Sequence, residues 1–568
     1  MNRLHARRAA RGQPAAGFVS QPEPRTIGRV ARGRQLCAGN FLIAGHVVEA
    51  PETQIWDLPL PDAAFEEELH GFTWLDDLAA AGDSLARERA QAWTKGWVDR
   101  FGTGVGPGWT PESTGRRLIR WINHAIFLLN AQEGDASEAY YRALGHQTTF
   151  LARRWRSADP GVPRFEALTG LIYAGLALIG MEAHVSPAVA ALARECAAQI
   201  DEQGGIPSRN PEELLEVFTL LNWASSALAE AGRIPPKPIL QAIERIAPTL
   251  RALRHSDGGL ARFHGGGRGL EGRLDHALAS SGVRTTPREG LAMGFARLSA
   301  ARTSLIIDVA PPPTGPDQRN AHASTLAFEL TSGRRPLIVN CGSGVPFGPD
   351  WAKAGRATAS HSVLEIEGYS SSRFGVQRRF GAAYREVLAD VPKDVRLRQN
   401  ADTGGNSILA GHDGYGATHG LAHVRTVDLS VDGRGLAGDD MLGTVTEDDK
   451  RLFDRANDGH KLQGIPFHIR FHLHPDVDAE VDMGGAAVSL VLKSGEIWIF
   501  RHDGAARMAL QPSVYLEKGR LKPRATKQIV LSARAMEYAT RIRWTLAKAQ
   551  DTPSHVRDLE RDDSEMMI

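Results

Sequence analysis

The sequence predicts an α+β protein of two domains, with a helical half followed by an antiparallel β half. Up to about residue 300, apolar residues recur every three or four positions, which is the period of a helix. From about Ser304 they alternate with polar residues every second position, which is the period of a strand. A chain of 568 residues is also too long for a single hydrophobic core.

The helical half, residues 36–300, contains about eight to ten predicted helices. Two of them have clear start signals. Thr110 is a predicted N-cap before Pro111, and Asn210 with Glu213 predicts a capping box. Short Gly/Pro connectors favour antiparallel helix pairs, which can form either a solenoid or a toroid. The predicted helices begin near Ala63, Asp83, Thr110, Asp135, Arg164, Ser186, Asn210 and Pro236.

Residues 301–548 contain many strand-like runs without intervening helices, which predicts a large antiparallel sandwich. The glycine-rich residues 255–300 connect the two halves, and a cleft is expected at such a domain junction. Residues 1–35 are rich in arginine and are predicted to be a disordered basic tail, with attraction to a membrane surface as the alternative. Residues 549–568 are predicted to be a frayed charged tail.

Composition excludes several classes of function. A formal net charge of +1 gives no reason to expect nucleic acid as a partner. No apolar run approaches the ~18 residues of a membrane span. No apolar core follows the basic N-terminal residues, so a signal peptide is not predicted and the sequence favours the cytoplasm. The three cysteines are too far apart to suggest a disulfide framework or a zinc motif.

The most informative segment runs from Asn320 to Gly368. Three polar motifs flank strand-like runs there: NAHAS opens TLAFEL, NCG follows PLIV, and SHSV opens the next run. Polar groups at the ends of neighbouring strands direct chemistry into a cleft. These motifs contain Asn320, His322, Asn340 and His361.

This block resembles the signature of the heparinase II/III family of polysaccharide lyases, where the slots read His-x-His-x-Asp, Asp-x-Gly and Ala-His-Asn-Thr. The similarity extends over nearly the whole chain and includes the helix GWTPESTGRRLIRWI. It implies an incomplete (α/α) toroid joined to a β-sandwich. It also implies β-elimination on a polysaccharide that contains uronic acid, with location outside the cytoplasm as the alternative to the sequence-based expectation.

Carried over by slot, the resemblance implies that Asn320, His322 and His361 are catalytic. His322, Asn340 and His361 occupy the slots that hold a structural zinc ion in some members. Neutral Asn340 weakens such a site, so we expect no cofactor, with zinc as the alternative. The usual tyrosine base is not matched, because Asn210-Pro211-Glu212-Glu213 stands in its slot and Arg164-Phe165-Glu166 in the slot of an Asn-His run. Tyr140, Tyr141 or Tyr173 would substitute only if the fold brought one into the cleft.

Four further residues are candidates for binding substrate. Arg356 has the guanidinium geometry that binds a carboxylate bidentately, with an interdomain ion pair as the alternative. Trp109 lies in a Gly/Pro loop and is a candidate for stacking on a sugar ring. His264 and Arg268 lie in the predicted interface loop and are candidates for contacting substrate. The alternative is that the glycines around them serve only the structure of the loop.

Three functions compete at this stage. The first is a lyase acting on an acidic polysaccharide. The second is a glycan-binding or envelope-assembly protein that keeps the fold but has lost its proton-transfer groups. Glycoside hydrolysis is the third, and it requires two convergent carboxylates that the strand-end block does not supply. The polymer and the oligomeric state stay open.

Overall fold

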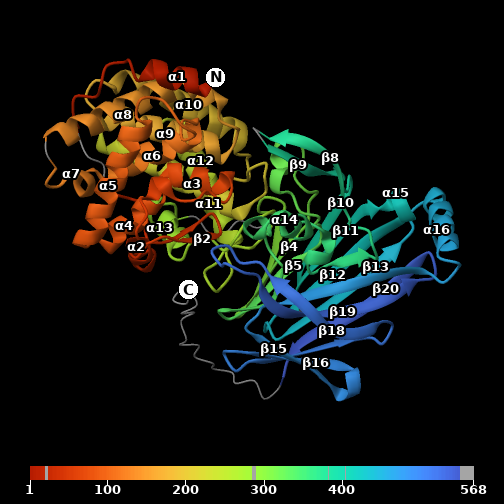
Figure 1. Ribbon diagram of the computed structural model, residues 1–568. Helices are drawn as coiled ribbons and strands as arrows, with labels where there is room; N and C mark the ends of the chain where they lie inside the picture. The colour runs from red at the N-terminus through yellow and green to blue at the C-terminus, as the bar shows by residue number, and fades with distance from the viewer. Residues whose placement is uncertain (20–22, 133, 285–289, 381–382, 403–404, 550–568) are drawn as a thin grey trace.

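A helical domain and a β-sandwich domain lie side by side, as the sequence predicts (Figure 1). The structure is a computed structural model that describes residues 1–19, 23–132, 134–284, 290–380, 383–402 and 405–549. The first strand of the sandwich begins at Phe295, slightly before the predicted boundary at residue 301. Within the described residues, no helix is both long and apolar enough to cross a membrane.

The helical domain is an incomplete (α/α) toroid of packed helix pairs. Its main helices are α3 (Ala63–Gly71), α4 (Trp74–Ala81), α5 (Ser84–Phe101), α6 (Pro111–Asn123), α8 (Gly134–Arg154), α9 (Val162–Ala177), α10 (Val185–Gln199), α11 (Pro211–Glu230) and α12 (Lys237–Ala252). The shorter helices are α1 (Asn2–Ala9), α2 (Val30–Cys37), α7 (Ala125–Leu129) and α13 (Arg273–Ser280). Helix α9 packs between α6 and α11, and these three helices contribute to the side that faces the sandwich.

Local sequence signals explain where the best-predicted helices begin. The Thr110 hydroxyl accepts the N–H of Ser113 at the start of α6, and Pro111 occupies the first turn. Helices α6 and α9 then approach closely, because a side chain at Gly115 would lie 2.5 Å from the carbonyl oxygen of Glu166. This close crossing brings Arg116 of α6 to the carboxylate of Glu166, 2.7 Å away.

The N-terminal residues are folded onto the helical domain, which differs from the predicted disordered tail. Helix α1 contacts α8, and its Ala6 and Ala9 are fully buried. Helix α2 contacts α4, and the N–H of Arg29 donates to Asp77 at 2.8 Å. Small alanines allow the close packing of α1, a signal that the high arginine content of this segment obscures.

The sandwich consists of two antiparallel sheets within the described residues. One has the order β10-β11-β12-β13-β20-β17-β16-β15, and the other has the order β18-β19-β14-β6-β5-β4-β3, with β7 paired to β14. The strands of the first sheet are β10 (Val395–Asp402), β11 (Gly405–Tyr415), β12 (Leu421–Ser430), β13 (Gly435–Gly443), β15 (Val477–Asp482), β16 (Ala487–Leu492), β17 (Ile497–His502) and β20 (Ala539–Lys548). The second comprises β3 (Phe295–Ala300), β4 (Thr303–Asp308), β5 (Phe328–Ser332), β6 (Arg335–Val339), β7 (Leu364–Ile366), β14 (Ile465–Leu473), β18 (Arg507–Tyr515) and β19 (Arg524–Ala535).

The two domains also meet through smaller elements. The hairpin β1 (Asn40–Ile43) and β2 (His46–Glu49) reaches the sandwich, because a side chain at Gly45 would lie 2.9 Å from the carbonyl oxygen of Pro346. On the sandwich side, the hairpin β8 (Arg373–Phe380) and β9 (Ala383–Asp390) extends toward the helical domain (Figure 1). The space between the domains is therefore bordered by loops from both.

Candidate functional site

The junction between the domains contains two adjoining cavities, which we call the interdomain cleft. The smaller has a volume of about 610 Å³ and the larger about 1180 Å³. Both are lined by residues from the two domains. They adjoin because four residues line both cavities: Arg116, Glu216, Leu270 and Arg273.

Asn320 is the predicted catalytic residue that lies at this cleft. It ends the short helix η4 (Gly315–Asn320) and lines the smaller cavity. Its Oδ1 accepts a hydrogen bond from Nη1 of Arg385, 3.2 Å away. Arg385 belongs to β9 and lines the larger cavity. Since Oδ1 faces Arg385, the amide nitrogen of Asn320 points elsewhere, and it has no hydrogen-bond partner among the described residues.

His322 and His361 lie close together but line neither cavity. They are 4% and 1% exposed, and Nδ1 of His322 lies 3.1 Å from Nε2 of His361. On its other side, Nδ1 of His361 lies 2.8 Å from the carbonyl oxygen of Ala357. A carbonyl only accepts, so His361 carries its proton on Nδ1 and accepts the proton of His322 on Nε2.

Burial keeps both histidines neutral. It lowers the pKa of His361 to about 4, and burial, with smaller contributions from the neighbouring histidines and from Arg356 and Lys518, lowers the pKa of His322 well below its ordinary value. As a neutral, hydrogen-bonded pair, His322 and His361 join the segments that precede β5 and β7. The resemblance assigns catalysis to these residues, and that role stays a proposal.

The three residues in the zinc slots do not fit a zinc ion. Asn340 follows β6 directly, and its Oδ1 accepts the N–H of Ser362 at 3.0 Å. The amide supplies no negative charge, and the two histidine nitrogens are engaged with each other. Among the described residues, no group of three or more His, Cys, Asp or Glu side chains is placed to hold a metal.

A carboxylate at position 340 is expected to create a zinc site. The change Asn340→Asp supplies the charged oxygen that the three zinc slots lack, and zinc affinity should increase at least about tenfold, or about 1.4 kcal/mol. Calorimetric titration with Zn²⁺ measures the difference. Adding His361→Ala to this variant should remove the gain. Equal zinc affinity in the wild type and Asn340→Asp would contradict this account of the site.

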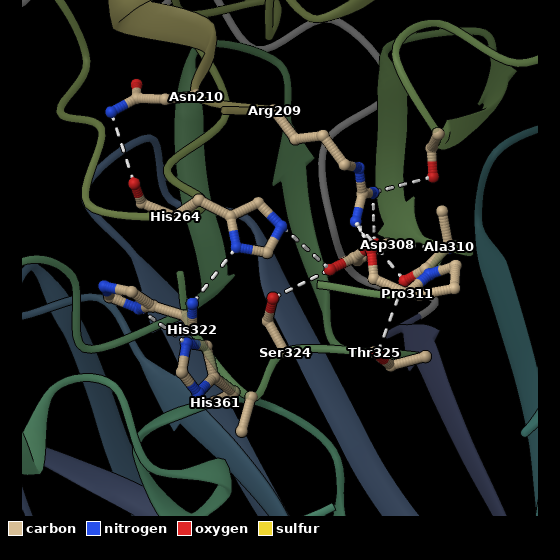
Figure 2. Close-up of polar contacts among 12 residues, drawn as sticks. Arg209, Asn210, His264, Asp308, Ala310, Pro311, His322, Ser324, Thr325 and His361 are labelled. Atoms are coloured by element: carbon tan, nitrogen blue, oxygen red, sulfur yellow. Dashed lines mark hydrogen bonds and ion pairs between the residues drawn. The ribbon is translucent and has the colours of Figure 1, made fainter. Parts of the chain in front are cut away.

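A buried polar network connects the two domains behind the histidines (Figure 2). Arg209, just before α11, donates to Oδ1 of Asp308 at 2.5 Å. The other carboxylate oxygen accepts from the hydroxyl of Ser324 at 2.7 Å and faces Nε2 of His264 at 3.5 Å. Nδ1 of His264 accepts the backbone N–H of His322. Burial raises the pKa of Asp308, but Arg209 and His264 outweigh it and hold the pKa well below its ordinary range.

None of the four predicted substrate contacts lines the cleft. His264 is fully buried in the network just described. Trp109 is only 2% exposed, and its Nε1 donates to the carbonyl of Phe101, so its Gly/Pro loop folds inward and no sugar can stack on it. Arg268 pairs with Asp257 at 3.0 Å and lines neither cavity.

Arg356 also differs from its predicted role as a carboxylate ligand. It is 8% exposed and donates to the carbonyl oxygens of Ala321 and Glu386. Burial and the nearby charge of Arg385 lower its pKa to about 10. Arg385 is the arginine that contacts Asn320 at the cleft. Sequence reasoning missed it because β9 lies outside the resembling block.

The tyrosines considered as substitute bases do not line the cleft. Tyr140 and Tyr173 are buried in the helical core, and Tyr141 packs against Tyr140 and Phe18. The residues in the tyrosine slot do reach the cleft, since Glu212 and Glu213 line the smaller cavity. The cleft therefore contains the carboxylates of Glu212 and Glu213 in the slot where the resemblance implies a tyrosine.

Comparison with known proteins agrees with this architecture. A family model described as "Heparinase II/III-like, C-terminal" matches residues 283–545. "FtsZ-localized protein C" of Caulobacter vibrioides (strain NA1000 / CB15N) is 30% identical over 546 residues, which cover 94% of this chain and 91% of that protein. The crystal structure of heparinase III has a TM-score of 0.68 at 12% identity and covers 96% of this chain and 88% of its own.

A second solved structure has the same fold. A mutant of the heparan sulfate lyase HepC from Pedobacter heparinus has a TM-score of 0.59 at 13% identity, over 97% of this chain and 88% of its own. A helical toroid joined to an antiparallel sandwich is the fold that this chain shares with both solved structures. The chain belongs to the heparinase II/III-like family.

Proposed function

We propose that this protein binds an acidic polysaccharide in the interdomain cleft and cleaves it by β-elimination beside a uronic-acid carboxylate. The contact between Arg385 and Asn320 carries the proposal. β-Elimination removes the weakly acidic proton on the carbon next to the sugar carboxylate. The reaction therefore requires groups that neutralise this carboxylate as negative charge develops.

Arg385 and Asn320 have the chemistry for that role. Arg385 forms no ion pair with a carboxylate of the described residues, and its bond to Asn320 uses only one of its five N–H groups. The amide nitrogen of Asn320, which has no hydrogen-bond partner among the described residues, can donate a further hydrogen bond to the same carboxylate. A uronate that enters the cleft would receive a charged and a neutral donor from adjacent side chains.

The local charge favours an anion at this place. Burial and the nearby charge of Arg319 both lower the pKa of Arg385, and Arg385 in turn lowers the pKa of Arg356. A cation with depressed pKa among other cations is stabilised when a carboxylate binds. The formal net charge of the whole chain, only +1, does not reveal this local group of cations.

The change Arg385→Gln is expected to weaken binding of a uronic-acid oligosaccharide about 10- to 100-fold, since a charge-assisted hydrogen bond contributes about 1.5–3 kcal/mol. Calorimetry with purified protein measures the affinity. Ultraviolet absorbance of the unsaturated product measures cleavage. Arg396→Gln, at an exposed arginine of β10, is the matched control and should change neither. Uronate polymers that are neither bound nor cleaved by the folded wild type would refute the proposal.

The second candidate is a glycan-binding protein of cell-envelope assembly without turnover. The observation that favours it is the enclosure of His322 and His361, which removes two proton-transfer groups of the family from the cleft. The relative that matches over nearly the whole length is, by its name, localised with FtsZ. We extend that localisation to this chain as part of this second proposal.

Three measurements separate the candidates. The lyase proposal expects unsaturated product from wild-type protein, whereas the binding protein expects measurable affinity and no product. A fluorescent fusion that follows FtsZ in dividing cells would support the second candidate, and a uniform distribution would oppose it. His361→Ala should leave glycan affinity unchanged under the second candidate.

A further inference from the structure

The elimination needs a base, and the smaller cavity contains a carboxylate that the fold does not use. Glu213 occupies the first turn of α11, where Asn210 caps the helix by accepting the N–H groups of Glu212 and Glu213. The predicted capping box is incomplete, because no hydrogen bond joins the carboxylate of Glu213 to the N–H of Asn210 in the described structure. Instead this side chain lines the cavity together with Asn320.

A glycine loop, Gly265–Gly267, lies between the start of α11 and Asn320. A side chain at Gly265, where φ is +83°, would lie 3.0 Å from Cβ of Asn320. A side chain at Gly266 would lie 2.5 Å from Oδ1 of Asn210. Because both positions are glycine, Asn210 at the start of α11 and the side chain of Asn320 can each pack against the backbone of this loop.

The carboxylates nearby are committed to other contacts. Glu212 pairs with Lys518 and accepts the N–H of Gly267 at 2.8 Å. Glu216 pairs with Arg273 at 2.7 Å. Among the described residues Glu213 and Asp317 of this cavity form no ion pair, so both are available to a ligand. Glu213 is the one of these two carboxylates that stands in the tyrosine slot, at the start of α11.

Its surroundings also suit proton transfer. Burial raises the pKa of Glu213, and Glu212 acts in the same direction. The hydroxyl of Ser208 and the charges of Lys518 and Arg319 oppose this, but the pKa stays above its ordinary value. A carboxylate with a raised pKa is a stronger base than an ordinary carboxylate.

We infer that Glu213 is the base of the elimination, in place of the absent tyrosine; this inference rests on the proposed function. Its carboxylate takes the proton from C5 of a uronic-acid unit whose own carboxylate is held by Arg385 and Asn320. The C5–H electrons form the C4=C5 double bond, and the C4–O bond breaks. The departing oxygen takes the proton back from Glu213, so the side chain ends as it began.

The change Glu213→Gln tests this role, because the amide keeps the shape and removes the basicity. Formation of unsaturated product should fall about 10²- to 10⁴-fold, the usual contribution of a general base. The affinity for an acidic oligosaccharide should stay within about threefold of wild type, since Arg385 and Asn320 are intact. Glu244→Gln, at an exposed position on α12, is the matched control.

A pH profile separates a base from a merely structural residue. In the wild type the rate should rise with pH as Glu213 ionises, and Glu213→Asp should keep this limb at a reduced rate. Wild-type product with undiminished cleavage by Glu213→Gln would overturn the inference while the proposed function stands. Wild-type protein that binds glycan but yields no product would overturn both the elimination and its base.

Discussion

Replacing Asp308 by asparagine is expected to lower the free energy of unfolding by about 3–5 kcal/mol, because removing one partner of a buried ion pair leaves the other charge uncompensated. The carboxylate is fully buried and receives Arg209, Ser324 and His264. With the N–H of Ala310, four donors converge on two oxygens, whereas asparagine offers one oxygen and adds a donor of its own. In at least one of these contacts the amide NH₂ of the asparagine then faces another hydrogen-bond donor.

The effect should appear as a loss of coupling between the domains. Arg209 belongs to the helical domain and Asp308 to β4 of the sandwich, and Arg209 also donates to the carbonyl oxygens of Met293 and Pro311. Arg209 and His264 both have positive φ values, 51° and 47°, which cost about 1–2 kcal/mol each. The network offsets this strain, so urea unfolding of the variant should separate into two transitions.

Acid should weaken the wild type through the same residue. The folded pKa of Asp308 is depressed, so its stabilisation is complete above the ordinary aspartate pKa of about 3.9 and is lost as the pH falls below it. The Asp308→Asn variant should lack this part of the acid dependence. Asp394→Asn, in an exposed pair with Arg396, is the control and should cost less than about 0.5 kcal/mol. A comparably small loss in Asp308→Asn would contradict the role assigned to the network.

Helix starts were predictable because their determinants are local. Thr110 and Asn210 cap helices by bonding to N–H groups two or three residues away, so a short window of sequence contains the whole signal. The pairing of Arg209 with Asp308 spans 99 residues and depends on how two domains meet. No periodicity or motif in the sequence marks either residue as a partner of the other.

Proximity at the site was easier to predict than exposure. The strand-end block indicated that His322 and His361 lie together, and they do, because β7 follows β6 along β14 and β5 pairs with β6. Their enclosure depends on loops that cross over them. Trp109 fails for a related reason: a Gly/Pro loop indicates a turn, but the turn here returns the indole to a core that includes Trp97 and Phe150.

Replacing Arg425 by methionine is expected to cost about 3–5 kcal/mol as well, through a different charge in the sandwich core. Arg425 is fully buried and binds both oxygens of Asp440, at 2.8 and 3.1 Å. Methionine fills similar space but leaves the carboxylate with only the neutral donors His423 and Trp544. A buried carboxylate without its cation then favours protonation, which a raised pKa of Asp440 would reveal.

This substitution should also disturb the candidate site, whereas Asp308→Asn acts between the domains. Nη1 of Arg425 donates to the carbonyl oxygens of Leu326 and Ser362, close in sequence to His322 and His361. Losing both bonds frees the two segments that hold the histidine pair. The imidazole NMR signals of His322 and His361 should therefore shift in Arg425→Met and broaden as the pair loosens.

A matched control isolates the effect of burial. Arg451→Met removes an arginine that is 75% exposed and pairs with Asp448 on the surface, and it should cost less than about 1 kcal/mol. The two variants lose the same side chain, so their difference in urea midpoint measures what enclosure adds to the pair. If Arg425→Met were no more destabilising than Arg451→Met, Asp440 would have to be neutral in the folded wild type, which its depressed pKa opposes.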